Sequence, residues 1–94
     1  MYTLEFTKSS LKELKRIDKS YQAFLIDSLE KFVQNFSLQY EADLMSMGKI
    51  KKLQGQKEEF YRLKLRSYRV IYKKYNEKLL IFVIHITTRE GAYK

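Results

Sequence analysis

The sequence of 94 residues has no cysteine, no proline, no tryptophan, only three glycines and a single histidine. Without cysteine it can form neither a disulfide framework nor a thiolate metal site, which is typical of proteins of the reducing cytoplasm. With His85 as its only imidazole, the chain lacks the ligands of a zinc site. We therefore expect neither a disulfide-rich nor a zinc-dependent fold, and no cofactor.

Long hydrophobic stretches are also missing. The longest, at 79–84, is far too short to cross a bilayer. The first residues show no basic segment followed by an apolar run, so they do not form a signal peptide. The chain is 45% hydrophobic and contains 8 tyrosines and 6 phenylalanines, enough for one modest core. We expect a single cytoplasmic domain over residues 1–94.

Acidic residues are scarce in the second half of the chain. Residues 1–48 carry 6 Lys and Arg against 7 Asp and Glu, whereas residues 49–94 carry 13 against 4. This asymmetry indicates a polyanionic partner, with nucleic acid as the first candidate and an anionic membrane as the second. No amphipathic helix carries the excess charge, which argues against the membrane.

The segment 60–75 contains no acidic residue and has the pattern of two strands joined at Ser67. Side chains along a strand point alternately to opposite faces. The alternation predicts one apolar face packed on the core and one cationic face. Such a face can be the solvated side of a half-buried sheet, but the absence of acidic residues favours an anionic ligand. The cationic face is expected to contain Arg62, Lys64, Arg66, Arg69 and Lys73.

The remaining pattern predicts a strand at 2–6, a short helix ending near Ile17 and a longer helix over 21–36. Ser10 and Glu13 have the spacing of a capping box for the first helix. Residues 37–48 are interpreted as a connection, 49–54 as a brief extended segment, and 79–86 as a strand buried on both faces or covered by a partner on one. The order is β-α-α-β-β-β, an α+β fold in which an N-terminal helical hairpin packs on one face of an antiparallel sheet.

Other residues with reactive side chains have simpler interpretations. His85 lies inside an apolar strand and is interpreted as a packed or sheet-edge histidine rather than an acid or base. Glu58 and Glu59 are interpreted as exposed turn carboxylates, although either could serve as a base. The tyrosines of the hairpin are assigned mainly to the core.

Several short motifs, taken in order, resemble the RelE/ParE superfamily of bacterial toxins from toxin–antitoxin operons. They are KLQG at 52–55, YRLKLR at 61–66, YRVIY at 68–72, FVI at 82–84 and TREGAY at 88–93. The resemblance implies a small toxin that is neutralised by an antitoxin protein, with which it forms an oligomer. Members of the RelE type enter the ribosome and cut the mRNA there, without a metal ion.

The resemblance also implies which residues act. Arg62 and Lys64 match two strand lysines near the scissile phosphate, Arg69 matches an arginine of the next strand, and Arg89 and Tyr93 match a C-terminal arginine and tyrosine. Tyr93 is expected either to transfer a proton or to stack on a base. The residues expected to bind RNA around this centre are Lys49, Lys51, Lys52, Arg66 and Lys73.

This chain departs from the pattern in two places, which leaves the general base open. Thr88 stands where many relatives have a histidine, and Arg62 stands where lysine is usual. The alternatives to a ribonuclease are a ParE-like inhibitor of DNA gyrase and a non-catalytic module that binds RNA or the antitoxin.

Overall fold

A computed structural model describes residues 1–55 and 57–88. The described part contains three helices and five strands. Their bounds are Thr3–Phe6 (β1), Lys8–Lys15 (α1), Lys19–Gln34 (α2), Leu38–Ser46 (α3), Ile50–Lys52 (β2), Tyr61–Leu65 (β3), Tyr68–Tyr75 (β4) and Leu80–Thr88 (β5). Within these residues, each helix is too short or too polar to span a bilayer.

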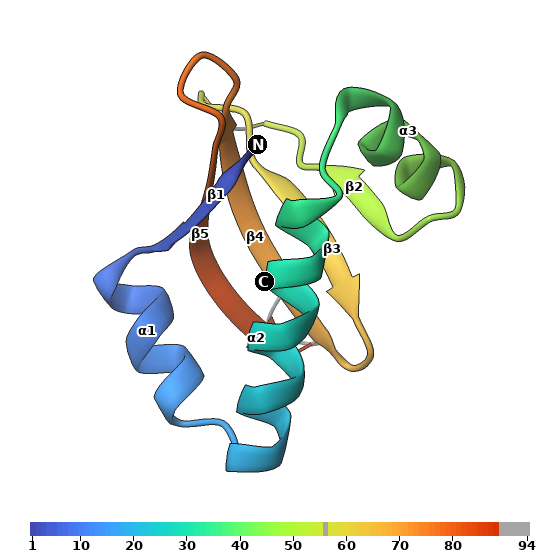
Figure 1. Ribbon diagram of the computed structural model, residues 1–94. Coiled ribbons are helices and arrows are strands. Elements are labelled where there is room, and N and C mark those ends of the chain that lie inside the picture. Colours follow the sequence, from blue (N-terminus) through green and yellow to red (C-terminus); the bar gives the residue numbers. More distant parts are fainter. Residues whose placement is uncertain (56, 89–94) are drawn as a thin grey trace.

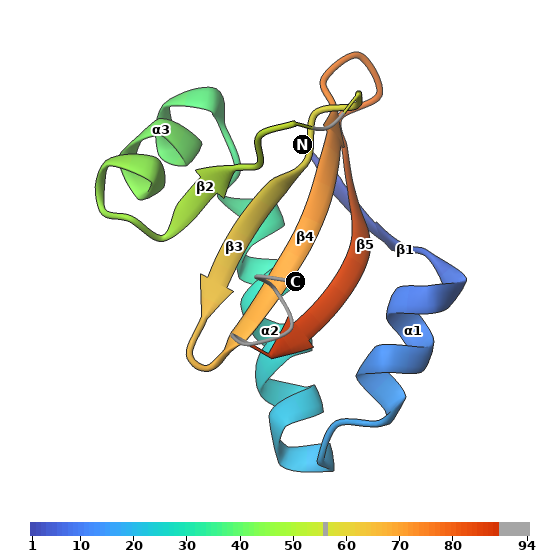
Figure 2. The same cartoon turned by 180° about the vertical axis from the view of Figure 1, so that it is seen from behind.

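The strands form one sheet in the order β1-β5-β4-β3-β2 (Figure 1). β2, β3, β4 and β5 pair antiparallel, and β1 pairs parallel with β5. Helices α1 and α2 lie on one face of the sheet, and α3 lies beside β2. Seen from behind, the opposite face of β3, β4 and β5 bears no helix among the described residues (Figure 2). We call this opposite side the open face.

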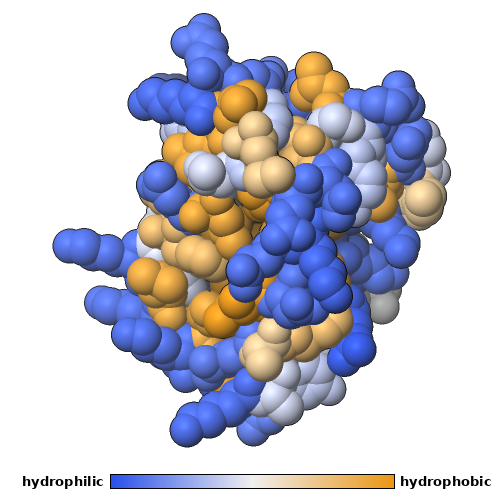
Figure 3. All heavy atoms as spheres, in the orientation of Figure 1, coloured by the Kyte–Doolittle hydropathy of each residue, from blue (hydrophilic) through white to orange (hydrophobic). Residues whose placement is uncertain are grey.

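The core lies between α2 and the middle of the sheet. Leu25 and Leu29 of α2 are almost fully buried against Val70, Ile81 and Val83 of β4 and β5. Burying each of these side chains stabilises the fold by about 1.5–3 kcal/mol. On the helix-bearing side, hydrophobic atoms gather over β1 and between α1 and α2, and hydrophilic atoms occupy much of the periphery (Figure 3).

The predicted α+β class, with two helices on one face, is confirmed. The sheet is mixed rather than purely antiparallel, because β1 runs parallel to β5. Parallel neighbours require a long crossover connection, and here most of the chain separates the two strands. Local alternation predicts a strand but not its partner, so this pairing was missed.

The expected connection at 37–48 is wrong, since it contains helix α3. Ser37 is its N-cap, and its hydroxyl accepts a hydrogen bond from the backbone N–H of Tyr40 at 3.0 Å. Leu44 packs into the core and Glu41 is buried. The serine was the available signal, because serine at an N-cap satisfies a free amide of the first turn.

The edge of β5 is covered in two ways. β1 pairs with its first four residues, from Leu80 to Val83. Beyond β1, side chains at the beginning of α1 contact the strand directly. The hydroxyl of Ser10 donates to the carbonyl of Val83 at 3.1 Å, and that of Thr7 donates to the carbonyl of Ile84 at 3.0 Å. Buried backbone groups need such partners.

The predicted capping box of Ser10 and Glu13 is wrong, because both side chains bond to β5. Thr7 is the N-cap of α1, and its Oγ1 accepts from the amide of Ser10 at 3.0 Å. Glu13 instead accepts a hydrogen bond from the backbone N–H of Ile86, at 3.0 Å. Both residues therefore join α1 to β5 rather than closing the helix end.

Candidate functional site

The pairing register places cationic side chains of three strands on the open face. Residues directly opposite each other in a sheet point to the same side. Arg62 of β3 faces Ile71 of β4, and Lys64 faces Arg69. On β2, Lys51 faces Arg62. The expected cationic face therefore exists, and by this register it contains Lys51, Arg62, Lys64, Arg69 and Lys73.

Arg62 and Lys64 occupy the middle of this face. Arg62 is half-buried and Lys64 is exposed. They are two positions apart on one strand, so their backbones are separated by roughly 7 Å. Their long side chains can therefore meet on a single phosphate group. An arginine can bind two phosphate oxygens at once.

Arg69 lies beside Lys64 but is 5% exposed. Its Nη1 donates to the backbone carbonyls of Arg66 and Tyr68, both at 3.0 Å. These bonds hold the turn between β3 and β4. The charge of Arg69 therefore contributes to the potential of the open face, while part of its guanidinium is committed to the backbone.

Arg66 does not belong to the cationic row, contrary to the alternation. It occupies the turn after β3 with a φ of 56°, in the left-handed region. Its guanidinium carbon lies 3.8 Å from the centre of the Phe24 ring of α2. The turn ends the alternation of side chains between the two faces of the sheet. Arg66 therefore points to the helix side, where it makes a cation–π contact.

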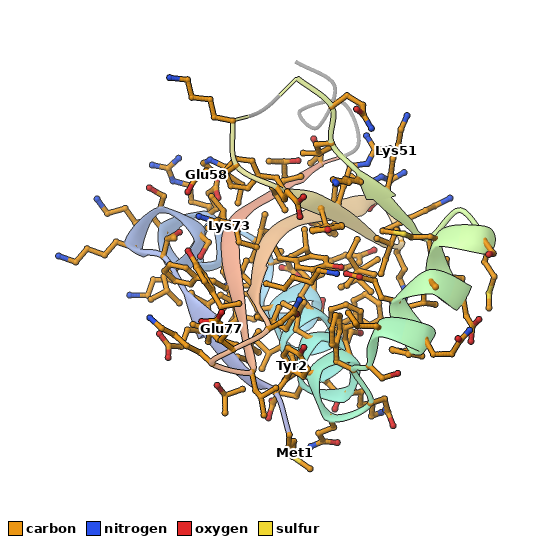
Figure 4. The ribbon with its side chains drawn as sticks, turned by 90° about the horizontal axis from the view of Figure 1, so that it is seen from above. Met1, Tyr2, Lys51, Glu58, Lys73 and Glu77 are labelled. Atoms are coloured by element: carbon orange, nitrogen blue, oxygen red, sulfur yellow. The ribbon has the colours of Figure 1, made fainter. Side chains whose placement is uncertain are left out.

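Two lysines expected to bind RNA have acidic partners from the loop before β3. Lys73 Nζ lies 2.5 Å from Glu58 Oε1, and Lys52 Nζ lies 3.2 Å from Glu59 Oε1. Figure 4 shows Lys73 and Glu58 side by side, with Lys51 apart from them. The hydrogen bond that Lys73 donates to Glu58 raises the pKa of Lys73, and the hydrogen bond and charge of Lys52 lower the pKa of Glu59. Both carboxylates are exposed, as predicted.

The side chains of Lys52 and Lys51 point to opposite faces of the sheet. Lys52 faces Tyr61, whose side chain is buried on the helix side. Lys49 precedes β2, and its carbonyl accepts from the amide of Lys64 at 2.8 Å. Lys49 lies outside the strand and, with Lys64, lines a pocket beside Lys31 of α2 and Tyr40 of α3.

A buried polar cluster on the helix side was not predicted. Glu41 of α3 is 4% exposed and accepts hydrogen bonds from Tyr72 Oη, at 2.6 Å, and from Lys74 Nζ. Burial and the adjacent carboxylate raise the pKa of Tyr72. Burial disfavours the charge of Lys74, but its bond to Glu41 outweighs this and raises its pKa. Nothing local signals this cluster, because its members come from distant segments.

Of the two interpretations from sequence, a packed or a sheet-edge histidine, the structure agrees with the second, because His85 lies on β5 beyond the residues that pair with β1. Its side chain is 51% exposed and its Nδ1 lies 3.4 Å from Glu13 Oε1. It faces Ile71 across the ladder, next to a register shift between Ile71 and Tyr72. Ile84 is the extra residue of β5 there, so the irregularity changes the alternation of the strand.

Arg89 and Tyr93 lie outside the described residues, and so does the C-terminal motif that contains them. Among the described residues, no three His, Cys, Asp or Glu side chains are grouped as metal ligands. What the described part brings together is a cationic sheet face with Arg62 and Lys64 of β3 at its centre and His85 on β5, on the far side of β4.

The profile of one protein family matches residues 4–93; it is described as the ParE toxin of type II toxin–antitoxin system, parDE. The match covers almost the whole chain. No curated protein sequence matches it significantly.

Solved structures with the same fold include toxins of such systems. The toxin in the intact RelBE toxin–antitoxin complex of E. coli is similar, with 27% identity, a TM-score of 0.67, and coverage of 94% of this chain and 96% of that chain. RelE of the archaeal RelE–RelB complex from Pyrococcus horikoshii has 22% identity, a TM-score of 0.68 and coverage of 94% of each chain. YafQ of E. coli has 17% identity and a TM-score of 0.69 over 100% of both chains.

Proposed function

We propose that this chain, which belongs to the ParE toxin family within the RelE/ParE superfamily of type II toxins, is an endoribonuclease that cleaves mRNA on the ribosome without a metal ion. It would thereby stop translation in the cytoplasm. The observation that carries the proposal is the placement of Arg62 and Lys64 side by side on the open face of the sheet.

RNA supplies its own nucleophile, the 2′-hydroxyl, so cleavage needs only proton transfer and stabilisation of the charge that develops on the phosphate. Fixed positive charge at that point is usually the largest contribution to the rate. Arg62 and Lys64 would contact the scissile phosphate, and their positions two residues apart on one strand support this role. Arg69 acts as a positioning residue, because its guanidinium holds the adjacent turn.

Arg89 and Tyr93 complete the proposed centre. Arg89 would be a second guanidinium on the phosphate. Tyr93 would transfer a proton or stack on a base, and stacking of this kind contributes about 1–3 kcal/mol. Lys51 would extend the phosphate-binding surface along the open face, and Lys49, just before β2, would add positive charge beside it. Lys73 would contribute less to phosphate binding, because the carboxylate of Glu58 partly neutralises its charge.

The partner that controls this toxin is an antitoxin protein, in keeping with the toxin–antitoxin complexes among its structural relatives. An acidic segment of the antitoxin would cover Arg62 and Lys64, and the two proteins would assemble into an oligomer. The open face also offers apolar contacts, because Leu80, Phe82 and Ile84 of β5 are only half-buried. Charge pairing would set the association rate and specificity, and apolar contacts the affinity.

A second candidate function is inhibition of DNA gyrase, since the matching family profile is that of the ParE toxin. A gyrase inhibitor would not require cations placed for phosphoryl transfer. The two functions therefore differ in what a single alanine on the open face should do.

The deciding experiment is expression of the toxin in growing cells, followed by mapping of mRNA 5′ ends and assay of DNA breaks. The wild type should arrest growth and produce new mRNA ends. Lys64→Ala and Arg89→Ala should each lower cleavage by about 10²–10³. Lys31→Ala is the matched control, because Lys31 is an exposed lysine of α2 that pairs with Asp27 of the same helix. Arrest with intact mRNA and accumulating DNA breaks would instead establish the gyrase function.

A further inference from the structure

His85 is placed within reach of the centre of the open face. Across the sheet, Arg62, Ile71 and His85 occupy one row on neighbouring strands. Two strand spacings separate the backbones of Arg62 and His85, which is about 10 Å. Ile71 between them is half-buried and uncharged. A phosphate over Ile71 would therefore lie between a guanidinium and an imidazole.

Glu13 holds one side of this imidazole. Its Oε1 lies 3.4 Å from His85 Nδ1 and also accepts the backbone N–H of Ile86 at 3.0 Å. The bond to Ile86 fixes the carboxylate against β5. A carboxylate facing Nδ1 selects the tautomer with the proton on that nitrogen, which leaves Nε2 as the proton acceptor. The half-exposed ring can then present Nε2 to a ligand on the open face.

Covering the edge of β5 does not by itself require a carboxylate. Ser10 and Thr7 satisfy the neighbouring carbonyls of the same strand with neutral hydroxyls. Glu13 also does something that they do not, because it brings a negative charge to an exposed imidazole. This is the arrangement of a proton-transfer pair, a base whose orientation is set by a carboxylate.

We propose that His85 is the general base of the ribonuclease and that Glu13 is its positioning residue, an inference that rests on the proposed function. Nε2 takes the proton of the 2′-hydroxyl, and the 2′-oxygen forms a bond to phosphorus. The bond from phosphorus to the 5′-oxygen breaks, and that oxygen takes a proton from water. The products are a 2′,3′-cyclic phosphate and a 5′-hydroxyl, and the imidazolium returns its proton to solvent. Tyr93 is then left to stack on a base.

The test is single-turnover cleavage of mRNA on purified ribosomes between pH 5.5 and 8.5, with wild type, His85→Gln, Glu13→Gln and Glu30→Gln. A general base acts only in its deprotonated form, so the wild-type rate should rise with pH and then level off. The charged groups that face His85 are Glu13 from α1 and, across β4, Arg62 and Arg69. Neither arginine loses its charge in this range.

His85→Gln should lower the rate constant by about 10²–10⁴ and abolish its rise with pH. RNA affinity and the melting temperature should stay close to wild type, because His85 is exposed. Glu13→Gln should lower the rate constant about tenfold and alter its pH profile, with affinity unchanged. Glu30→Gln, which removes the same charge from an exposed position of α2, should match wild type. Addition of imidazole should restore part of the activity of His85→Gly.

If wild type cleaves and His85→Gln has the same rate constant and pH profile, the inference is wrong while the proposed function stands. The same conclusion follows if both variants lose only thermal stability, since Glu13 and His85 would then merely hold α1 on β5. If wild type does not cleave mRNA at all, the proposed function fails, and this role of His85 fails with it.

Discussion

Lys73 and Lys74 are neighbours on β4, yet they belong to opposite faces of the sheet and to different physical regimes. Lys74 points to the helix side, where its side chain is 12% exposed and bonds to the buried Glu41. Lys73 points to the open face and pairs with the exposed Glu58. On the helix side the chain provides its own counter-charge in a buried cluster. On the open face the pair of Lys73 and Glu58 has a carboxylate that is 60% exposed, and Lys64 is exposed at the centre.

The comparison shows that two adjacent lysines on one strand can have different roles, one in stability and one in binding. A buried charge must be paired, because an unpaired one is strongly destabilising. A solvated pair contributes little to stability and can be exchanged for an external anion. We therefore expect substitutions on the helix side to change folding and those on the open face to change binding and activity.

The largest effect is expected from Glu41→Ala. It leaves the ammonium of Lys74 and the hydroxyl of Tyr72 without their partner in a buried place. Loss of one member of a buried pair typically costs about 3–5 kcal/mol. Urea denaturation followed by circular dichroism would measure the free energy of unfolding.

The control for this prediction is the double variant Glu41→Leu with Lys74→Met. Replacing both charges with apolar side chains of similar size removes the unpaired ammonium, so much of the stability should return. If Glu41→Ala alone unfolds at the same urea concentration as wild type, the buried cluster does not stabilise the fold.

A second prediction concerns alkaline pH. Burial and Glu41 raise the pKa of Tyr72, and the bond to Glu41 raises that of Lys74. Both groups are therefore protonated more readily in the folded state, and their contribution is complete below the unfolded tyrosine pKa of about 10. It is lost as the pH rises above that value. At pH 11, Tyr72 alone should lower the free energy of unfolding by on the order of 1 kcal/mol.

This alkaline loss should be smaller in Tyr72→Phe, measured by urea denaturation at pH 8 and pH 11. The comparison within each protein removes the cost of the lost hydroxyl at neutral pH. An equal loss in wild type and variant would show that other groups cause it.

A third prediction uses Lys51 and Lys52, which are neighbours on β2 but face opposite sides. If RNA binds the open face, Lys51→Ala should weaken binding a few-fold. It should also reduce the slope of log affinity against log salt by about one phosphate contact. Lys52→Ala should leave that slope unchanged. Fluorescence anisotropy with a labelled single-stranded RNA at several salt concentrations would measure both, and equal slopes would place the RNA elsewhere.

The smallest effect is expected from Glu58→Ala. In its pair with Lys73, the carboxylate of Glu58 is exposed to solvent. Loss of the pair should therefore lower the free energy of unfolding by about 0.2–1 kcal/mol. RNA affinity should rise slightly, because Lys73 gains freedom to contact a phosphate. The same anisotropy and urea measurements test this, and a loss of several kcal/mol would contradict the distinction between the two faces.

Much of the fold could be predicted locally. The alternation in β3 and β4 and the helical spacing in α2 follow from residues a few positions apart, and both elements were predicted. Tyr21 and Ile26, assigned to the apolar stripe of that helix, are 40% and 37% exposed. The stripe predicts a side of the helix but not how far the neighbouring elements cover it.

The candidate site was predicted less completely. Arg62 and Lys64 were placed on one face correctly, since alternation is a property of the strand itself. Arg66 was misplaced because a left-handed turn residue ends the alternation. His85 was interpreted as packed or at a sheet edge because its neighbours in sequence are apolar. The sequence could not decide between the two, because its exposure depends on a register shift relative to β4.

The sequence by itself determined most of the elements, with α3 as the exception, as well as the α+β class and the concentration of positive charge in the second half, because each depends on local periodicity or on composition. Only the tertiary structure decided what each side chain meets. It pairs β1 with β5, joins Glu13 to Ile86 and His85, and places Glu41 beneath Lys74. These partners are 31 or more positions apart, and periodicity records the direction of a side chain but not the residue that lies opposite.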